Sequence, residues 1–179
     1  MGRKPKHPKP SSITIYNKIF KRLEDSPIDI YFCYEKFKYS EELKRDKYIV
    51  HLIFINPLSV SKAKYLTEVL FKVVKLLKLE NPSTNLNNSI VYSIFDLPKG
   101  VRFTPDFRMI DQIINYKDAE FDLNIKLGHI IGLFNKGNKR QLLIMSLVRK
   151  YLKNFPVYIV TELESAYSLI DSYKEIKDC

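Results

Sequence analysis

The sequence predicts an α/β fold with a mixed, mainly parallel sheet of about five strands, and two observations lead to this prediction. From position 89 to 173, β-rich runs alternate with stretches of helical periodicity, a pattern that favours right-handed crossovers between parallel strands. Upstream, two β-rich runs follow each other across a short charged connection, which is typical of a hairpin. We therefore expect a β-hairpin before the parallel strands, with helices packed on the sheet.

The composition is that of a globular domain. The chain has 179 residues, of which 45% are hydrophobic and 28% charged, and this suits one domain with one sizeable core. No segment approaches the roughly 20 consecutive apolar residues that span a bilayer. No apolar run follows the basic N-terminus in the manner of a secretory signal. We therefore expect no membrane partner and a cytoplasmic location.

The positive charge is concentrated at the N-terminus. The formal net charge is +10, and the first 23 residues contain seven Lys or Arg and no acid. Residues 1–12 are rich in lysine and proline, which predicts an extended basic tail. Residues 13–27 are predicted to form a helix and a linker. Ser11 or Ser12 can cap this helix, and Ile15, Ile19, Phe20 and Leu23 lie roughly on one helical face.

The main domain is predicted to span residues 28–176 and to begin with the hairpin. Residues 28–39 alternate between apolar and polar side chains, and residues 48–55 are almost continuously apolar, as in a central strand. A long helix is expected from about residue 59 or 61 to residue 79, because its apolar residues form a broad stripe. The polar segment 80–88 predicts a loop.

The next unit combines a strand, a turn and a helix. Residues 90–95 predict a third strand, which ends on Asp96 and is followed by a Pro/Gly turn. Thr104-Pro105-Asp106 then places a cap, a first-turn proline and an acid in the order typical of a helix start. We expect this helix to cover residues 105–116.

The last part repeats the alternation of strands and helices. A fourth strand is predicted over residues 127–134, and a turn over residues 135–139 precedes a helix over residues 140–152. Residues 157–160 predict a fifth strand. Thr161-Glu-Leu-Glu164 has the pattern of a capping box, so we expect a final helix that ends near Ile176.

Three stretches carry a resemblance to a known family: FDLPKGVRFTPDF, LGHIIGLFNKGNKRQLLIMSL and FPVYIVTELESAYSLI. Their order of strands, glycine turns and helix starts resembles that of the STAS/SpoIIAA-like superfamily, which includes anti-sigma-factor antagonists. The resemblance covers residues 28–173. It implies a STAS-like fold and a non-enzymatic role in protein interaction or regulation, with a protein partner.

One departure from the family pattern affects the expected mechanism. Members that act as phosphoswitches carry Asp-Ser-Ser-Gly at the start of the helix that follows the Asp-Leu strand. Here the corresponding residues are Thr104-Pro105-Asp106-Phe107, so there is no serine to phosphorylate. The resemblance therefore implies a member without the phosphoserine switch. Its expected interaction surface comprises Asp96, Lys99, Arg102, Thr104 and Asp106.

Asp96 is the strongest candidate for chemistry, because ligand sites in α/β folds lie at the carboxyl ends of strands. It could act as a phosphoacceptor or general base, or it could cap the turn by accepting hydrogen bonds from the Lys99 or Gly100 amides. The sequence pairs no histidine with Asp96, and His51 and His129 read as core or edge residues of their strands. We therefore predict no catalytic residue. An enzyme that uses Asp96 is the third hypothesis, after an interaction module and a nucleic-acid-associated protein.

The sequence also indicates no metal site or cofactor. The three histidines are scattered, and no Cys/His group has the spacing of metal ligands. Cys33 lies in an apolar run and Cys179 is the last residue, which favours free thiols over a disulfide.

Basic residues in two places support a second hypothesis, a nucleic-acid-associated protein. The tail can gain affinity for DNA or RNA by releasing counterions from phosphates. The loop after the fourth strand lies at a helix N-terminus, where cations and free amides can hold a phosphate, although it also reads as a solvated turn in which Gly137 adopts positive φ. The candidate contact residues are Arg3, Lys4, Lys6, Lys9, Lys136, Lys139 and Arg140.

Overall fold

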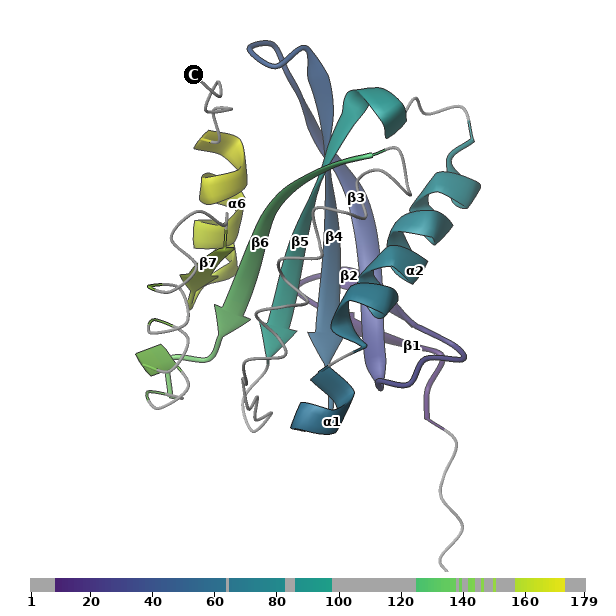
Figure 1. Ribbon diagram of the computed structural model, residues 1–179, viewed down its shortest axis with the longest axis vertical. Helices are drawn as coiled ribbons and strands as arrows, with labels where there is room; N and C mark the ends of the chain where they lie inside the picture. Colours follow the sequence, from purple (N-terminus) through teal and green to yellow (C-terminus); the bar gives the residue numbers. More distant parts are fainter. Residues whose placement is uncertain are drawn as a thin grey trace, which may run out of the picture.

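Seven strands form one mixed sheet in which the spatial order follows the sequence (Figure 1). This computed structural model describes residues 9–63, 65–82, 86–97, 125–137, 139, 142–143, 146, 150 and 157–172. The strands are β1 (Ser12–Ile15), β2 (Lys18–Arg22), β3 (Ile30–Ser40), β4 (Arg45–Phe54), β5 (Ser89–Leu97), β6 (Lys126–Phe134) and β7 (Val157–Val160). The helices are α1 (Val60–Ala63), α2 (Leu66–Glu80), the 3-10 helix η1 (Leu86–Asn88) and α6 (Leu163–Ser172).

Strand direction changes at β4. The pairs β1–β2, β2–β3 and β3–β4 are antiparallel, whereas β4–β5, β5–β6 and β6–β7 are parallel. This confirms the α/β class and the mixed sheet. The expected number of about five strands was too low, because the segment before β3 adds two more.

The helix predicted within residues 13–27 was wrong, since this segment forms the β1–β2 hairpin. Phe20 is buried, whereas Ile19 is 68% exposed, so burial here follows the two-residue period of a strand. The turn residues Tyr16 and Asn17 have φ values of 54° and 57°. Two successive positive φ values are typical of the type I′ turns that connect tight hairpins.

The hairpin leaves the plane of the sheet after a short contact. Only Lys21 and Arg22 of β2 are in register with β3, opposite Phe32 and Tyr31. Phe20 then packs with Tyr31 and Ile53, and the hairpin crosses behind the sheet in the view of Figure 1. The hairpin therefore covers part of one sheet face.

The other described elements agree with the predicted order of strands and helices. The β3–β4 hairpin is confirmed, as are α2, β5, β6, β7 and a helix after β7. Lys139, Leu142, Leu143, Ser146 and Lys150 are helical, in agreement with a helix after β6. The helix predicted over residues 105–116 lies outside the described residues.

Helices α2 and α6 cover opposite faces of the sheet. Val73 and Leu77 of α2 belong to a buried cluster with Val50 and Leu52 of β4. Ala166 and Ile170 of α6 instead pack with a second cluster that contains Ile94 and Ile131. Because side chains alternate between the faces of a strand, the two clusters lie on opposite sides of the sheet. None of the described helices is long and apolar enough to cross a membrane.

A buried lysine fixes the C-terminal end of α6. Lys47 Nζ donates hydrogen bonds to the carbonyl oxygens of Ile170 (2.7 Å) and Asp171 (3.2 Å). Burial and the nearby Lys38 lower the pKa of Lys47. A cation at this position binds the unpaired carbonyls of the last helical turn. The N-terminal end of α6 is thereby directed toward the carboxyl ends of β5 and β6.

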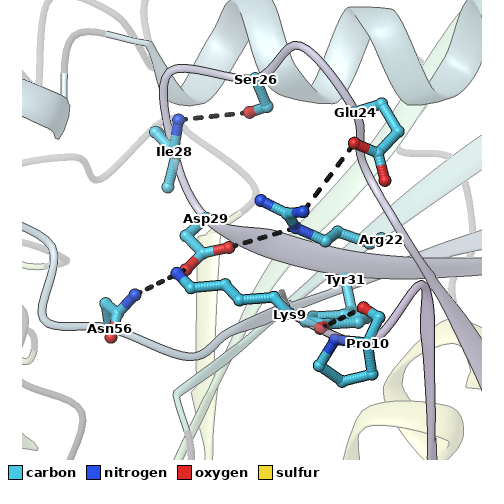
Figure 2. Close-up of polar contacts among 9 residues, drawn as sticks. All are labelled: Lys9, Pro10, Arg22, Glu24, Ser26, Ile28, Asp29, Tyr31 and Asn56. Atoms are coloured by element: carbon cyan, nitrogen blue, oxygen red, sulfur yellow. Dashed lines mark hydrogen bonds and ion pairs between the residues drawn. The ribbon is translucent and has the colours of Figure 1, made fainter. Parts of the chain in front are cut away.

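The base of the N-terminal tail is attached to the start of β3 (Figure 2). The Asp29 carboxylate pairs with Lys9 and accepts a hydrogen bond from Asn56 Nδ2 at 2.6 Å. Arg22 Nε lies 3.6 Å from the other Asp29 oxygen. The Tyr31 hydroxyl donates a hydrogen bond to the Pro10 carbonyl oxygen at 2.7 Å. Residues 9 and 10 are therefore held at a defined place on the domain.

Replacement of Gly128 tests the close packing of β5 and β6. A Cβ atom at Gly128 would lie 2.6 Å from ring carbons of the buried Tyr92. We expect Gly128→Ala to lower the free energy of unfolding by about 1–3 kcal/mol in a urea titration. Gly137→Ala is the control, because Gly137 is exposed and its nearest neighbour is a side-chain oxygen at 3.2 Å. Equal losses in the two variants would contradict this packing.

Candidate binding site at the carboxyl ends of the parallel strands

A buried carboxylate and a buried imidazole meet near the ends of β4 and β5. His51 Nε2 lies 3.2 Å from Asp96 Oδ2, and the two side chains are only 2% and 3% exposed. The strand register places Ile53 directly opposite Asp96. His51 lies two residues before Ile53, so its side chain points to the same face of β4. The parallel sheet therefore brings together two residues that are 45 positions apart in the sequence.

The hairpin turn adds a tyrosine to this pair. The Tyr16 side chain hydrogen-bonds to Asp96, and its ring stacks on the His51 ring with centroids 5.8 Å apart. The Phe20 ring contacts the same imidazole edge-on, with the ring centroids 5.0 Å apart. Partial burial and the negative charge of Asp96 raise the pKa of Tyr16 well above its usual value. Tyr16 therefore remains a neutral hydrogen-bond donor.

A second contact holds the hairpin beside α6. Lys18 bonds to Glu35 of β3 and to the Tyr167 hydroxyl of α6, and that hydroxyl donates to Glu35 at 2.7 Å. Burial alone would lower the pKa of Lys18, but these hydrogen bonds outweigh it and raise the pKa. The hairpin and α6 are thus joined over the same sheet face.

A cavity of about 220 Å³ opens next to Asp96. The ends of β5 and β6, the hairpin turn and the start of α6 all contribute to it. Its lining residues are Tyr16, Asp96, Leu97, Leu133, Phe134, Asn135, Thr161, Glu162, Leu163 and Glu164. A second hollow of about 480 Å³ shares Thr161 and is lined also by Leu142, Ser146, Ile159, Val160 and Ser165.

The Asp96 carboxylate is engaged by neighbouring side chains of its own chain. It already accepts hydrogen bonds from the Tyr16 hydroxyl and from His51. The His51 ring is buried and contacts the rings of Tyr16 and Phe20. A general base must lie within hydrogen-bonding reach of the proton that it removes. Within the described part of the chain, no group of three or more His, Cys, Asp or Glu residues could hold a metal ion.

The predicted contact residues do not gather at one place. Asp96, which we expected on an interaction surface, is buried and lines the cavity. Lys9 pairs with Asp29, whereas Lys136 pairs with Glu162 and lowers the pKa of that carboxyl. Lys139 is helical, and its side chain is exposed. The remaining predicted site residues lie outside the described residues: Arg3, Lys4, Lys6, Lys99, Arg102, Thr104, Asp106 and Arg140.

The loop after β6 differs from the glycine turn that we expected. Gly137 does not have a positive φ. Its amide instead donates a hydrogen bond to Asn135 Oδ1 at 2.9 Å. An asparagine side chain that binds the backbone two residues later stabilises such turns without left-handed backbone.

His51 and Tyr16 are the residues of the candidate site that sequence reasoning missed. His51 was interpreted as a core or edge histidine, and its burial agrees with this, but its partner is Asp96. Alternation within the two strands places both side chains on one face, and only the strand register brings them within hydrogen-bonding distance. Tyr16 could have been found through its turn, but Tyr-Asn lacks the glycine that usually marks a type I′ hairpin.

Comparisons of the chain with protein-family models, curated proteins and solved structures found no match.

His129 provides a pH test of the face that α6 covers. Its ring contacts Tyr92 and Tyr158, and burial, together with the charge of Lys47, lowers its pKa from 6.5 to about 4. Because the unfolded chain binds this proton more tightly, stability should fall as the pH drops from about 6.5 to 4, by up to about 3 kcal/mol. Urea titrations across this range should show a smaller decrease for His129→Leu, whereas Leu79→Ala should keep the wild-type profile. Identical profiles for wild type and His129→Leu would contradict this assignment.

Proposed function

We propose that the protein is a non-enzymatic interaction or regulatory module that receives one side chain of a protein partner in the cavity beside Asp96. The position of the cavity carries this proposal, because α/β proteins bind ligands at the carboxyl ends of parallel strands. The resemblance of residues 28–173 to STAS/SpoIIAA-like proteins supports the same class of function. The absence of a serine at residues 104–107 favours a module without a phosphoserine switch.

The size of the cavity favours a side chain over a complete small molecule. Sites for drug-sized ligands usually have volumes of about 300–1,000 Å³, whereas this cavity has about 220 Å³. The adjoining hollow of about 480 Å³ shares Thr161 with it and offers room for neighbouring parts of a partner. A protein segment that inserts one side chain would use both features.

The nucleic-acid hypothesis now depends mainly on the tail. Lys9 and Lys136 are engaged with Asp29 and Glu162, so a phosphate would have to compete with these carboxylates. Arg3, Lys4 and Lys6 carry the remaining positive charge of the tail. The described residues therefore favour a protein partner over DNA or RNA.

Co-purification with blocked variants tests the proposed function. Thr161→Trp and Asn135→Trp should fill the cavity or its entrance, so a stoichiometric partner recovered from native cells with the wild-type chain should be lost. Leu79→Trp is the matched control, because Leu79 is 74% exposed on α2, on the opposite sheet face. Circular dichroism checks that each variant is folded. Retention of the same partner by folded Thr161→Trp and Asn135→Trp proteins would disprove the proposed role of the cavity.

A further inference from the structure

The charge of Asp96 is buried without a described cation beside it. Its two hydrogen-bond donors are the Tyr16 hydroxyl and His51 Nε2. His51 Nδ1 is buried and has no hydrogen-bond partner among the described residues. Neither contact brings a lysine or arginine side chain to the carboxylate.

The described residues that line the cavity beside Asp96 carry no compensating positive charge. The described lining of the cavity contains no Lys or Arg, and Glu164 adds a further carboxylate. Lys136, outside the lining, is paired with Glu162. A buried charge is costly unless an opposite charge accompanies it. An anion at this position would be repelled, whereas a cation in the cavity would pair with Asp96.

We propose that the side chain received by this cavity is a lysine of the partner, with its ammonium group near Asp96. This inference rests on the proposed function and specifies its chemistry. Leu97, Leu133 and Phe134 provide an apolar wall for the methylene stem. Arginine fits less well, because its planar guanidinium prefers a carboxylate with both oxygens available, and Asp96 already accepts two hydrogen bonds.

Three small probes of equal length test this specificity. The probe n-butylammonium reproduces the end of a lysine side chain, n-butyrate carries the opposite charge, and n-butanol is neutral. In ¹H–¹⁵N spectra of the full chain, n-butylammonium should cause saturable shifts at the amides of Asn17, Asn135 and Glu164. Butyrate and butanol should cause no saturable shift there. Absence of n-butylammonium binding, or equal binding of either other probe, would overturn the proposal.

Matched charge removals locate the interaction. Asp96→Asn should weaken n-butylammonium binding roughly ten- to a hundredfold, because it removes a charge-assisted hydrogen bond. Glu164→Gln should weaken it severalfold, and this exposed position provides the test if Asp96→Asn does not fold. Glu68→Gln removes the same charge from the exposed side of α2 and should leave the affinity unchanged. Equal affinities in the wild type and in both site variants would overturn the proposal.

The lysine specificity and the interaction role of the cavity can be disproved separately. If n-butylammonium binds but Thr161→Trp and Asn135→Trp retain the partner, the cation site stands and the proposed function fails. If those variants lose the partner but n-butylammonium does not bind, the interaction role of the cavity stands and the lysine specificity fails.

Discussion

The contact of Asp96 with Tyr16 and His51 is the interaction on which the arrangement of this end of the molecule depends. Only two residue pairs of β2 and β3 are in register in the sheet, so the direction of the hairpin depends on contacts near its turn, which also include the Lys18–Glu35 pair. Tyr16 reaches Asp96 and covers His51 from a backbone conformation that non-glycine residues rarely adopt. The same contact makes Tyr16 a wall of the cavity. A change in the hairpin would therefore alter both the burial of Asp96 and the shape of the cavity.

Two buried charged residues mark opposite ends of the face that α6 covers. Lys47 binds the carbonyls at the C-terminal end of α6, and Asp96 lies beside the cavity that the start of this helix lines. Lys47 is compensated by carbonyl dipoles of its own chain, whereas the described lining of the cavity brings no lysine or arginine to Asp96. This difference separates Lys47, which holds α6, from Asp96, which belongs to the proposed binding site.

Most of the sheet could be predicted from the sequence, because the runs that form β4, β5 and β6 are strongly apolar and are separated by turn residues. It failed for residues 13–23, where Ile15, Ile19 and Leu23 fit a helical period by coincidence and no glycine marks the turn. Ile19 is exposed and Phe20 is buried, so tertiary packing determined the outcome. The position of Asp96 at a strand end was predictable. Its contacts with His51 and Tyr16 were not, because they depend on strand register and on the folding of the hairpin over the sheet.

A double-mutant cycle between Tyr16 and Asp96 tests this account most directly. Free energies of unfolding would be measured by urea titration for the wild type, Tyr16→Phe, Asp96→Asn and the double variant. If the hydroxyl and the carboxylate hold the hairpin on the sheet, the two substitutions should couple by about 1–3 kcal/mol. Additive effects, with a coupling near zero, would show that the hairpin is held by other contacts and would contradict the central role of Asp96.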